Sequence, residues 1–336
     1  MAKKEIAHLF YVEPLSAWWR GKLGYFPFIS RDKLSIVRGR LIVPGERWRW
    51  IRGINRNLLA KQISRQIKRG SYEVVIFYHP WDLPLAQKVA SGAKVIFDWT
   101  DNWARYYEFP EMNQEQELAV KSSDGVIAVT NILGNMAKQY RHDDNVLILH
   151  NATLFKPLSN DISIPQALQT IPRPRIGYIG HIGPWFDIDL LIRLVRIRPE
   201  WHWILVGSMR EEIRVKLINY PNIHSINVQA IEDIPGWMAG CDVLAAPYRS
   251  GLEGDATKLY DYLTSGLPIV SSLIETSSRL QPWVSIARNE KEWVEKLQKA
   301  INEKEHSVRY ARQQASLQHH WSHRAETLLE WLTSLL

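Results

Sequence analysis

Short apolar segments rich in β-branched residues alternate along the chain with segments whose apolar residues recur every three or four positions. The first pattern is typical of buried strands and the second of amphipathic helices, so their alternation predicts parallel α/β layers. The expected strands of the first half span residues 6–12, 74–78, 95–98, 126–130 and 146–149. Those of the second half span 175–179, 202–206, 222–226, 243–246, 269–271 and 284–287. The interval 21–52 is compatible with both strand and loop.

Length and one proline-rich interval predict the domain organisation. A chain of 336 residues exceeds the size of a usual single hydrophobic core, so two domains are expected. Residues 156–174 hold four prolines and no strong hydrophobic period, which predicts a linker between the domains. From Ser322 onward the pattern predicts one amphipathic C-terminal helix, whose apolar stripe is Ala325, Leu328, Leu329 and Leu332.

Positive charge is concentrated near the N-terminus. Residues 1–69 hold 16 Lys and Arg against 4 Asp and Glu, and the rest holds 26 against 31, so the net charge of +7 arises in the first fifth of the chain. Tryptophans alternate with these cations, at Trp18, Trp19, Arg20 and Lys22 and again at Arg47, Trp48, Arg49, Trp50 and Arg52. This combination suits an anionic membrane surface or a lipid-phosphate acceptor. A solvated basic face with some packed tryptophans is the alternative, and no recognition motif supports nucleic acid.

The same features bear on location. No apolar run approaches the roughly 20 residues that cross a bilayer, and the short N-terminal apolar stretch is interrupted by Glu13 and Pro14, which indicates a first strand and not a signal peptide. Cys241 is the single cysteine and suits a reducing compartment. We therefore expect a cytoplasmic protein, peripheral on the cytoplasmic face of the membrane if the basic region binds lipid.

The most informative segment is YRSGLEGDATKLYDYLTSGLPIVS, residues 248–271. Asp255 is suited to cap a short helix that Gly266 ends, with a strand directly after it. Lys258 then lies in the first turn, where exposed N–H groups and the helix dipole attract phosphate. Asp261 lies one helical neighbour further and suits ribose hydroxyls, while Glu253 in the preceding loop suits the sugar. A capped helix with a solvated Lys–Asp pair is the alternative interpretation.

A second glycine-containing segment supports a ligand site. RIGYIGHIGPWFDIDLL, residues 175–191, predicts a strand, a loop with Gly180, His181 and Gly183, and a helix. The glycines do not form the dinucleotide fingerprint, but they would let backbone N–H groups approach a pyrophosphate. Gly207 opens a further turn at the carboxyl end of a strand, where open α/β sheets bind ligands.

Five segments in order carry a family resemblance: HNATLFKP, IGYIGHIGPWFDIDLLI, PEWHWILVGS, NIHSINVQAIEDIPGWMAGCDVLAAPYRSG and KLYDYLTSGLPIVSS. From about Arg175 to Ser271 the chain resembles the donor domain of GT-B-fold glycosyltransferases, in particular family 4 and a subgroup acting in bacterial surface-polysaccharide assembly. The resemblance implies that Glu253 and Asp261 take the places of two glutamates that contact the donor sugar and ribose. It also implies retention of anomeric configuration.

Two positions depart from the family pattern. The family has an Arg after the loop glycine and a Lys five residues later, where this chain has His181 and Phe186. We therefore expect the diphosphate to find its charge at Lys258 and Arg249, with Thr257 beside them. No metal site is predicted, because Asp187-Ile188-Asp189 reads as a helix cap and first turn, and enzymes of this resemblance generally need no catalytic metal.

Candidate acceptor residues follow two strands of the first half. His79 and Trp81 follow one strand, and Asp98, Asp101 and Trp103 follow the next. Flat aromatics pack against sugar rings, and His79 or Asp101 is placed to orient or deprotonate an acceptor hydroxyl. Ordinary turn and cap roles are the alternative for each.

These inferences predict two Rossmann-like domains facing a cleft. Residues 1–155 would bind the acceptor, 156–174 link the domains, 175–315 bind a UDP- or GDP-linked sugar, and 316–336 cross back to the N-terminal domain. The expected activity is transfer of that sugar to a saccharide or polyprenyl-linked acceptor, without a separate cofactor. A sugar-nucleotide epimerase and a catalytically silent nucleotide-sugar-binding module are the alternatives.

Overall fold

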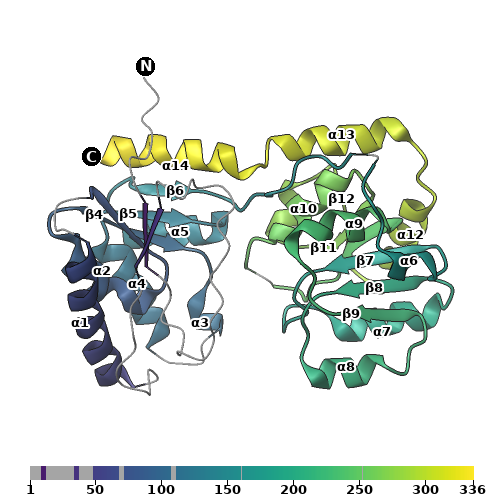
Figure 1. The fold of residues 1–336 in the computed structure, drawn as a ribbon, viewed down its shortest axis with the longest axis horizontal. Helices are drawn as coiled ribbons and strands as arrows, with labels where there is room; N and C mark the ends of the chain where they lie inside the picture. Colours follow the sequence, from purple (N-terminus) through teal and green to yellow (C-terminus); the bar gives the residue numbers. More distant parts are fainter. Residues whose placement is uncertain are drawn as a thin grey trace. The chain divides into compact units, whose positions relative to one another are not determined.

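The computed structural model of the protein describes residues 9–12, 34–37, 48–67, 72–106, 111–159, 161–251 and 253–336. Its chain divides into two compact units (Figure 1). The first comprises Met1–Leu149 with Thr327–Leu336, and the second comprises His150–Glu326. Each unit carries its own sheet and its own buried core.

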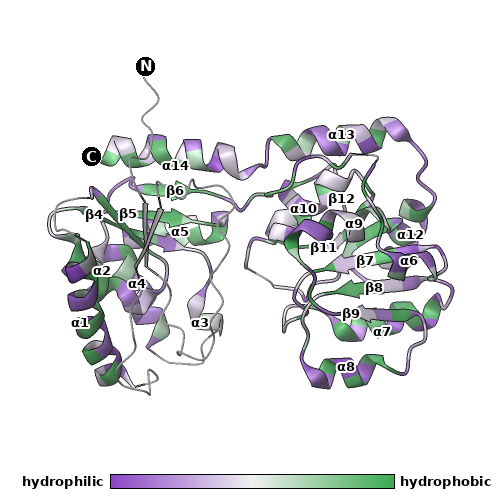
Figure 2. Ribbon diagram, in the orientation of Figure 1, coloured by the Kyte–Doolittle hydropathy of each residue, from purple (hydrophilic) through white to green (hydrophobic). Residues whose placement is uncertain are grey.

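The N-terminal unit is built on a parallel sheet whose described strands have the order β3-β4-β5-β6. They span Val74–Phe77, Lys94–Trp99, Gly125–Ala128 and Val146–Ile148. The helices that join and flank them are α1 (Arg49–Gln66), α2 (Leu83–Ala90), α3 (Trp103–Tyr106), α4 (Met112–Ser122) and α5 (Asn131–Tyr140). A separate parallel pair joins β1 (Leu9–Val12) and β2 (Leu34–Val37). In Figure 2 hydrophobic residues dominate β5, whereas α1 alternates hydrophobic with hydrophilic residues.

The C-terminal unit holds a parallel sheet whose described strands have the order β12-β11-β10-β7-β8-β9. They span, from β7 to β12, Arg175–Ile179, His202–Val206, Ile223–Ile226, Val243–Ala246, Ile269–Ser272 and Val284–Ala287. Strand order runs outward in both directions from the β7–β10 pair, so a topological switch point lies between these two strands. Open α/β sheets bind ligands at the carboxyl ends of the strands that flank such a point.

Helices cover both faces of this second sheet, as parallel strands require. They are α7 (Ile188–Ile197), α8 (Glu211–Leu217), α9 (Ile234–Ala239), α10 (Thr257–Ser265), α11 (Glu275–Arg279), α12 (Glu290–Ile301) and α13 (His306–Leu317). Every residue of β7, β10 and β11 is buried. The predicted α/β class is therefore confirmed, and the predicted strands of both sheets are present within one or two residues of their expected bounds.

The predicted linker belongs to the C-terminal unit. Within residues 156–174, α6 (Gln166–Gln169) buries Leu168 completely in the second core. A side chain at Gly240 would meet Leu168 Cδ1 at 2.3 Å, so the segment packs directly on the end of α9. The proline-rich segment is therefore a connection that packs on the C-terminal unit, and not a free linker.

The C-terminal helix returns to the first unit. α14 spans Trp321–Leu335, and residues from Thr327 onward cluster with the N-terminal unit. A Cβ at Gly125 of β5 would lie 2.8 Å from the Trp331 ring, so this indole packs on the glycine. α13 stays with the second unit, where Arg312 donates to the Gly266 carbonyl at 3.2 Å.

The basic N-terminal region is only partly described, because Trp18, Trp19, Arg20, Lys22 and Arg47 lie outside the described residues. On α1, Arg52 and Arg56 are buried and form ion pairs with Glu111 at 3.6 Å and Asp82 at 2.6 Å. These two arginines therefore belong to the fold and not to a solvated basic face. Trp48 and Trp50, in contrast, are 52% and 64% exposed. Among the described helices, none is long and apolar enough to span a membrane.

Candidate functional site

Two glycine turns meet at the carboxyl ends of β7 and β8. Gly180 has a φ of +139° and Gly207 a φ of +142°, which L side chains rarely adopt. A Cβ at Gly207 would lie 2.3 Å from the Gly180 carbonyl oxygen, so no side chain fits between the turns. The Gly180 N–H donates to Val206 O at 2.8 Å, and Ile182 N–H donates to Ser208 O at 2.8 Å. The turns are thus locked together beside the switch point, as the site prediction requires.

Lys258 of α10 lies across the first of these turns. A Cβ at Gly180 would meet Lys258 Cε at 2.6 Å, so the aliphatic stem occupies the space that the glycine leaves. Its Nζ lies 5.1 Å from the centroid of the Tyr178 ring and 5.7 Å from that of Tyr248, within cation–π range. Burial lowers the pKa of Lys258 to about 8, although Asp261 opposes the shift. Lys258 therefore places an ammonium group at the switch point, and Asp261 is the acidic group that acts on its charge.

Asp261 lies one helical turn from Lys258 on the same helix. The Thr153 hydroxyl donates to its Oδ1 at 2.7 Å. Burial raises the pKa of Asp261 to about 6, while the Thr153 hydrogen bond and the Lys258 charge act in the opposite direction. A half-buried carboxylate therefore accompanies the cation.

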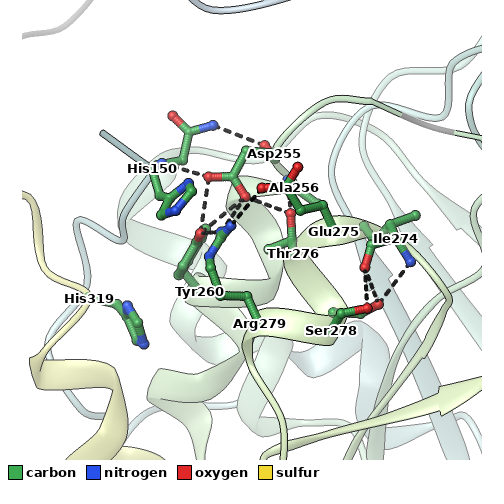
Figure 3. Close-up of polar contacts among 12 residues, drawn as sticks. His150, Asp255, Ala256, Tyr260, Ile274, Glu275, Thr276, Ser278, Arg279 and His319 are labelled. Atoms are coloured by element: carbon green, nitrogen blue, oxygen red, sulfur yellow. Dashed lines mark hydrogen bonds and ion pairs between the residues drawn. The ribbon is translucent and has the colours of Figure 1, made fainter. Parts of the chain in front are cut away.

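Asp255 does not cap α10, contrary to the prediction from sequence. The N-cap residue is Ala256 and makes no side-chain cap bond. The Asp255 carboxylate is fully buried and accepts hydrogen bonds from several elements (Figure 3). Its partners are the Asn151 N–H at 2.7 Å, the Tyr260 hydroxyl at 3.0 Å, the Thr276 hydroxyl at 2.5 Å and the Arg279 guanidinium at 2.9 Å. The tertiary partners replace the cap because they satisfy a buried charge better than one helix end would.

The positions that depart from the family pattern have new roles. His181 Nδ1 lies 2.7 Å from Ser208 Oγ, which ties the two glycine turns together through side chains. Phe186 is 1% exposed and packs edge-to-face on Tyr178, with ring centroids 4.6 Å apart. Phe186 thus packs against the Tyr178 ring and offers no charge, which leaves Lys258, itself partly buried, as the cation at the Gly180 turn within the described residues.

Other predicted donor residues lie around this centre. Gly183 is covered by Trp185, since a Cβ there would meet the indole at 2.8 Å. Thr257 is the exposed first residue of α10, and Glu253 lies partly exposed in the loop before it. Arg249 is exposed and pairs with Asp189 at 3.8 Å. The structure therefore brings Lys258 to the Gly180 turn, with Asp261 beside it on α10, whereas Arg249 is paired with Asp189.

Asp187 has the cap role that the sequence predicts. Its carboxylate accepts a hydrogen bond from the Leu190 N–H at 2.9 Å and begins α7. Asp189 falls in the first turn and faces Arg249. The Asp-x-Asp motif is therefore divided between a cap and an ion pair.

The N-terminal unit gathers three of the predicted acceptor residues. The His79 ring lies 4.7 Å from Trp81 and 4.9 Å from Trp103, measured between centroids. The Arg52 guanidinium lies over the Trp81 ring, 4.0 Å from its centroid. The rings of His79, Trp81 and Trp103 therefore lie together after β3, and flat aromatic rings of this kind can pack against a sugar ring.

The two predicted carboxylates of this unit differ in setting. Asp98 is the penultimate residue of strand β4, and burial raises its pKa to about 6. Asp101 lies partly buried in the loop between β4 and α3. A carboxyl group with a raised pKa is suited to proton transfer near neutrality, which makes Asp98 the stronger candidate for a base.

Sequence reasoning missed the residues that organise the donor side from a distance. Asn151 and Thr153 reach Asp255 and Asp261 across 104 and 108 positions of sequence. Tyr260, Thr276 and Arg279 complete the Asp255 network. The available signal was local: Asn151 and Thr153 closely follow the strand ending at Ile148, at the edge where ligands bind.

Part of the chain is similar in sequence to known proteins. Residues 173–303 match the family described as glycosyl transferases group 1. The chain is 22% identical over 222 residues to a protein named as the teichuronic acid biosynthesis glycosyltransferase TuaH of Bacillus subtilis, covering 60% of this chain and 56% of that protein. It therefore spans little more than half the length of that relative.

Solved structures share the fold. HepE of Anabaena, solved with UDP and glucose, superposes with a TM-score of 0.69 at 16% identity, covering 90% of this chain and 86% of that one. Sucrose-phosphate synthase of Thermosynechococcus elongatus gives 0.69 at 12% identity, covering 89% and 83%. These similarities confirm the predicted GT-B fold.

We predict that Gly207→Ala lowers the free energy of unfolding by about 3 kcal/mol or more, because it adds both backbone strain and a clash with Gly180. Gly92→Ala is the matched control, since Gly92 has a φ of +95° but open space around its Cβ. The control should cost about 1 kcal/mol, the conformational part alone. Equal losses in urea unfolding would contradict the close contact of the two turns.

Asp255→Ala should destabilise the protein by about 3–5 kcal/mol, because Arg279 and two hydroxyls lose a buried anionic partner. The comparison is Glu290→Ala, which removes the partner of Arg193 from a pair whose side chains are 50% and 41% exposed. That change should cost less than about 1 kcal/mol. Chemical denaturation of both variants measures the difference, and a loss at Asp255 no larger than at Glu290 is the result that the network does not allow.

Proposed function

Since residues 173–303 form a glycosyl transferases group 1 domain, we propose that this chain transfers a sugar from a UDP- or GDP-linked donor to a saccharide or lipid-linked acceptor in cell-surface polysaccharide biosynthesis. The observation that carries the proposal is the placement of the Lys258 side chain against the Gly180 turn at the switch point, with Asp261 one helical turn further along α10. The name of the TuaH relative and the UDP and glucose in the HepE structure support the substrate class.

The chemistry assigned to each donor residue follows from charge. As the bond from sugar to diphosphate breaks, negative charge grows on the leaving phosphate, and Lys258 with the N–H groups of the glycine turns would stabilise it. Asp261 would accept hydrogen bonds from ribose hydroxyls, and Glu253 would contact the sugar. The Lys258 ammonium is already desolvated, so its interaction with phosphate is less screened than that of a surface lysine.

The N-terminal unit would bind the acceptor. His79, Trp81 and Trp103 supply an aromatic surface with a polar handle, and Asp98 or Asp101 would orient the attacking hydroxyl. We propose retention of configuration, on the family resemblance. A carboxylate that fully deprotonates the acceptor would instead favour inversion, and product stereochemistry distinguishes the two.

Incubation with a panel of UDP- and GDP-sugars and oligosaccharide or polyprenyl-phosphate acceptors, followed by mass spectrometry of the products, tests the proposal. The expected result is release of the nucleoside diphosphate together with an acceptor one sugar heavier. An isomerised donor without transfer would identify an epimerase. Nucleotide binding without turnover under any combination would identify a silent binding module.

The affinity for UDP should be greatest between about pH 6 and about pH 8, from the pKa values of Asp261 and Lys258. Below this range the Asp261 carboxylate is protonated and ceases to accept two ribose hydrogen bonds. Above it the Lys258 ammonium is neutralised and loses its attraction for phosphate. Titration calorimetry across the range measures both limbs.

Two variants identify which residue causes the fall in UDP affinity on each side of the pH optimum. Lys258→Ala should abolish the fall in UDP affinity at alkaline pH. Asp261→Asn should reduce the fall at acid pH to the part that is caused by protonation of UDP itself. Unchanged wild-type affinity from neutrality to well above pH 8 would argue that Lys258 does not contact the diphosphate.

We further propose that the N-terminal end of α1 binds an anionic membrane surface. Trp48 and Trp50 are exposed beside Arg49, whose side chain is 80% exposed while it pairs with Glu115 at 3.9 Å. Lys61 and Arg65 are exposed further along the same helix. Indoles and cations together suit the headgroup region.

Co-sedimentation with phosphatidylglycerol vesicles should therefore fall steeply with salt, and the Trp48→Ala/Trp50→Ala variant should bind several-fold more weakly. Tyr310→Ala is the matched control, since Tyr310 is 63% exposed on the other unit. Equal binding of wild type to neutral vesicles, or equal losses in both variants, would refute this surface.

A further inference from the structure

Thr153 occupies an unusual place in the C-terminal unit. It is fully buried, yet it lies in a connection and not in a strand or helix of the core. Its hydroxyl oxygen accepts a hydrogen bond from the Phe155 N–H at 3.0 Å. A hydroxyl has a single proton to donate, and that proton is directed to Asp261 Oδ1 at 2.7 Å. An ionised carboxylate can only accept, so Thr153 is the donor of the Thr153–Asp261 bond while its own oxygen accepts from the backbone.

The backbone of Thr153 is itself clamped from a distant part of the chain. Its N–H donates to His319 O at 2.8 Å, and its carbonyl accepts from the Trp321 N–H at 3.1 Å. These bonds form an isolated parallel bridge at the junction between α13 and α14. Two residues earlier, Asn151 is held by Asp255, through its N–H at 2.7 Å and its side-chain amide at 2.9 Å (Figure 3 shows the Asp255 network).

The segment is therefore held at its start and at its middle. The Asp255 network holds its start, the α13–α14 junction holds its middle, and the one side-chain proton that it offers is aimed at a carboxylate of α10. Within the described residues, Thr153 is the hydrogen-bond partner of the Asp261 side chain, and the contact uses Oδ1. Among the same residues the second oxygen, Oδ2, receives no hydrogen bond and can accept from a ligand.

We propose that Thr153 is a positioning residue for the donor site, which orients the Asp261 carboxylate and keeps it ionised for the ribose of a nucleoside diphosphate. This inference rests on the proposed function. A carboxylate with one oxygen anchored loses less rotational freedom on binding than a free one, so its two ribose bonds form at a lower entropic cost. Thr153 acts through Asp261 and does not itself contact the ligand.

The charge state of Asp261 reports on this role. The Thr153 bond holds the pKa of Asp261 down, in opposition to burial, and Lys258 acts in the same direction as Thr153. Tyr248 and Tyr262 also face the carboxylate, but the pKa values of both phenols lie well above 10. At the clamping junction, the pKa of His319 is lowered to about 4 by burial and by nearby arginines. His320 is a further titratable neighbour of Thr153, so the titration of Asp261 must be observed directly.

Thr153→Val tests the proposal, because it keeps the shape and removes the hydroxyl. In the ligand-free protein, the carboxyl ¹³C resonance assigned by its loss in Asp261→Asn should titrate at higher pH than in wild type. The affinity for UDP at pH 7 should fall about tenfold. Thr153→Ser, which retains the donor, should restore both values.

Thr264→Val is the matched control. Thr264 is also fully buried, and its hydroxyl bonds to the backbone carbonyl of Asp261 at 2.6 Å and not to the carboxylate. This variant should lose stability without moving the Asp261 titration. In an Asp261→Asn background, Thr153→Val should weaken UDP binding no further, because its effect passes through the carboxylate.

The outcomes separate the two proposals. Wild type that binds neither UDP nor GDP would overturn the proposed function. Wild type that binds UDP while Thr153→Val leaves the Asp261 titration and the affinity unchanged would overturn the role of Thr153 alone. A full loss of affinity in both the wild-type and Asp261→Asn backgrounds would also overturn it, since Thr153 would then act on binding independently of Asp261.

Discussion

The contact between the backbones of Gly180 and Gly207 is the constraint on which the C-terminal unit depends. Two strands that flank or adjoin the switch point end in turns so close that a Cβ on the second would lie 2.3 Å from the carbonyl of the first. The absence of a side chain at Gly180 leaves space that the Lys258 stem occupies. Everything proposed for the donor side, from the desolvated ammonium to the N–H groups near it, requires this backbone approach.

A desolvated cation and a half-buried carboxylate are costly to hold at one helix end. The structure meets this cost with layers of support around α10. Tyr178 and Tyr248 face the Lys258 ammonium, and Phe186 packs beneath Tyr178 in the place where the family carries a cation. Behind the helix start, Asp255 links the chain entering the unit to α11. An aromatic ring at position 186 thus supports the tyrosine that faces the Lys258 ammonium.

Much of this could be predicted from the sequence because the signals are local. The strands are short, apolar and β-branched, and Lys258 and Asp261 are neighbours on one helix. The misassignment of Asp255 has a physical reason, since an aspartate before a helix suits a cap equally well until distant partners such as Arg279 are known. The role of Thr153 could not be predicted for the same reason, because its hydrogen-bond partner lies 108 residues away in the sequence. Helix α1 escaped prediction because the buried Arg52, Asn55 and Arg56 interrupt its apolar stripe.

The central claim is that the glycine turns and the start of α10 together hold a nucleoside diphosphate. Amide hydrogen exchange with and without saturating UDP, followed by mass spectrometry, tests it most directly. We predict that saturating UDP slows amide exchange in peptides that cover residues 178–186 and 255–262. In Lys258→Ala, UDP should give no such protection. Protection confined to the N-terminal unit, or binding of UDP that leaves both of these segments unchanged, would contradict it.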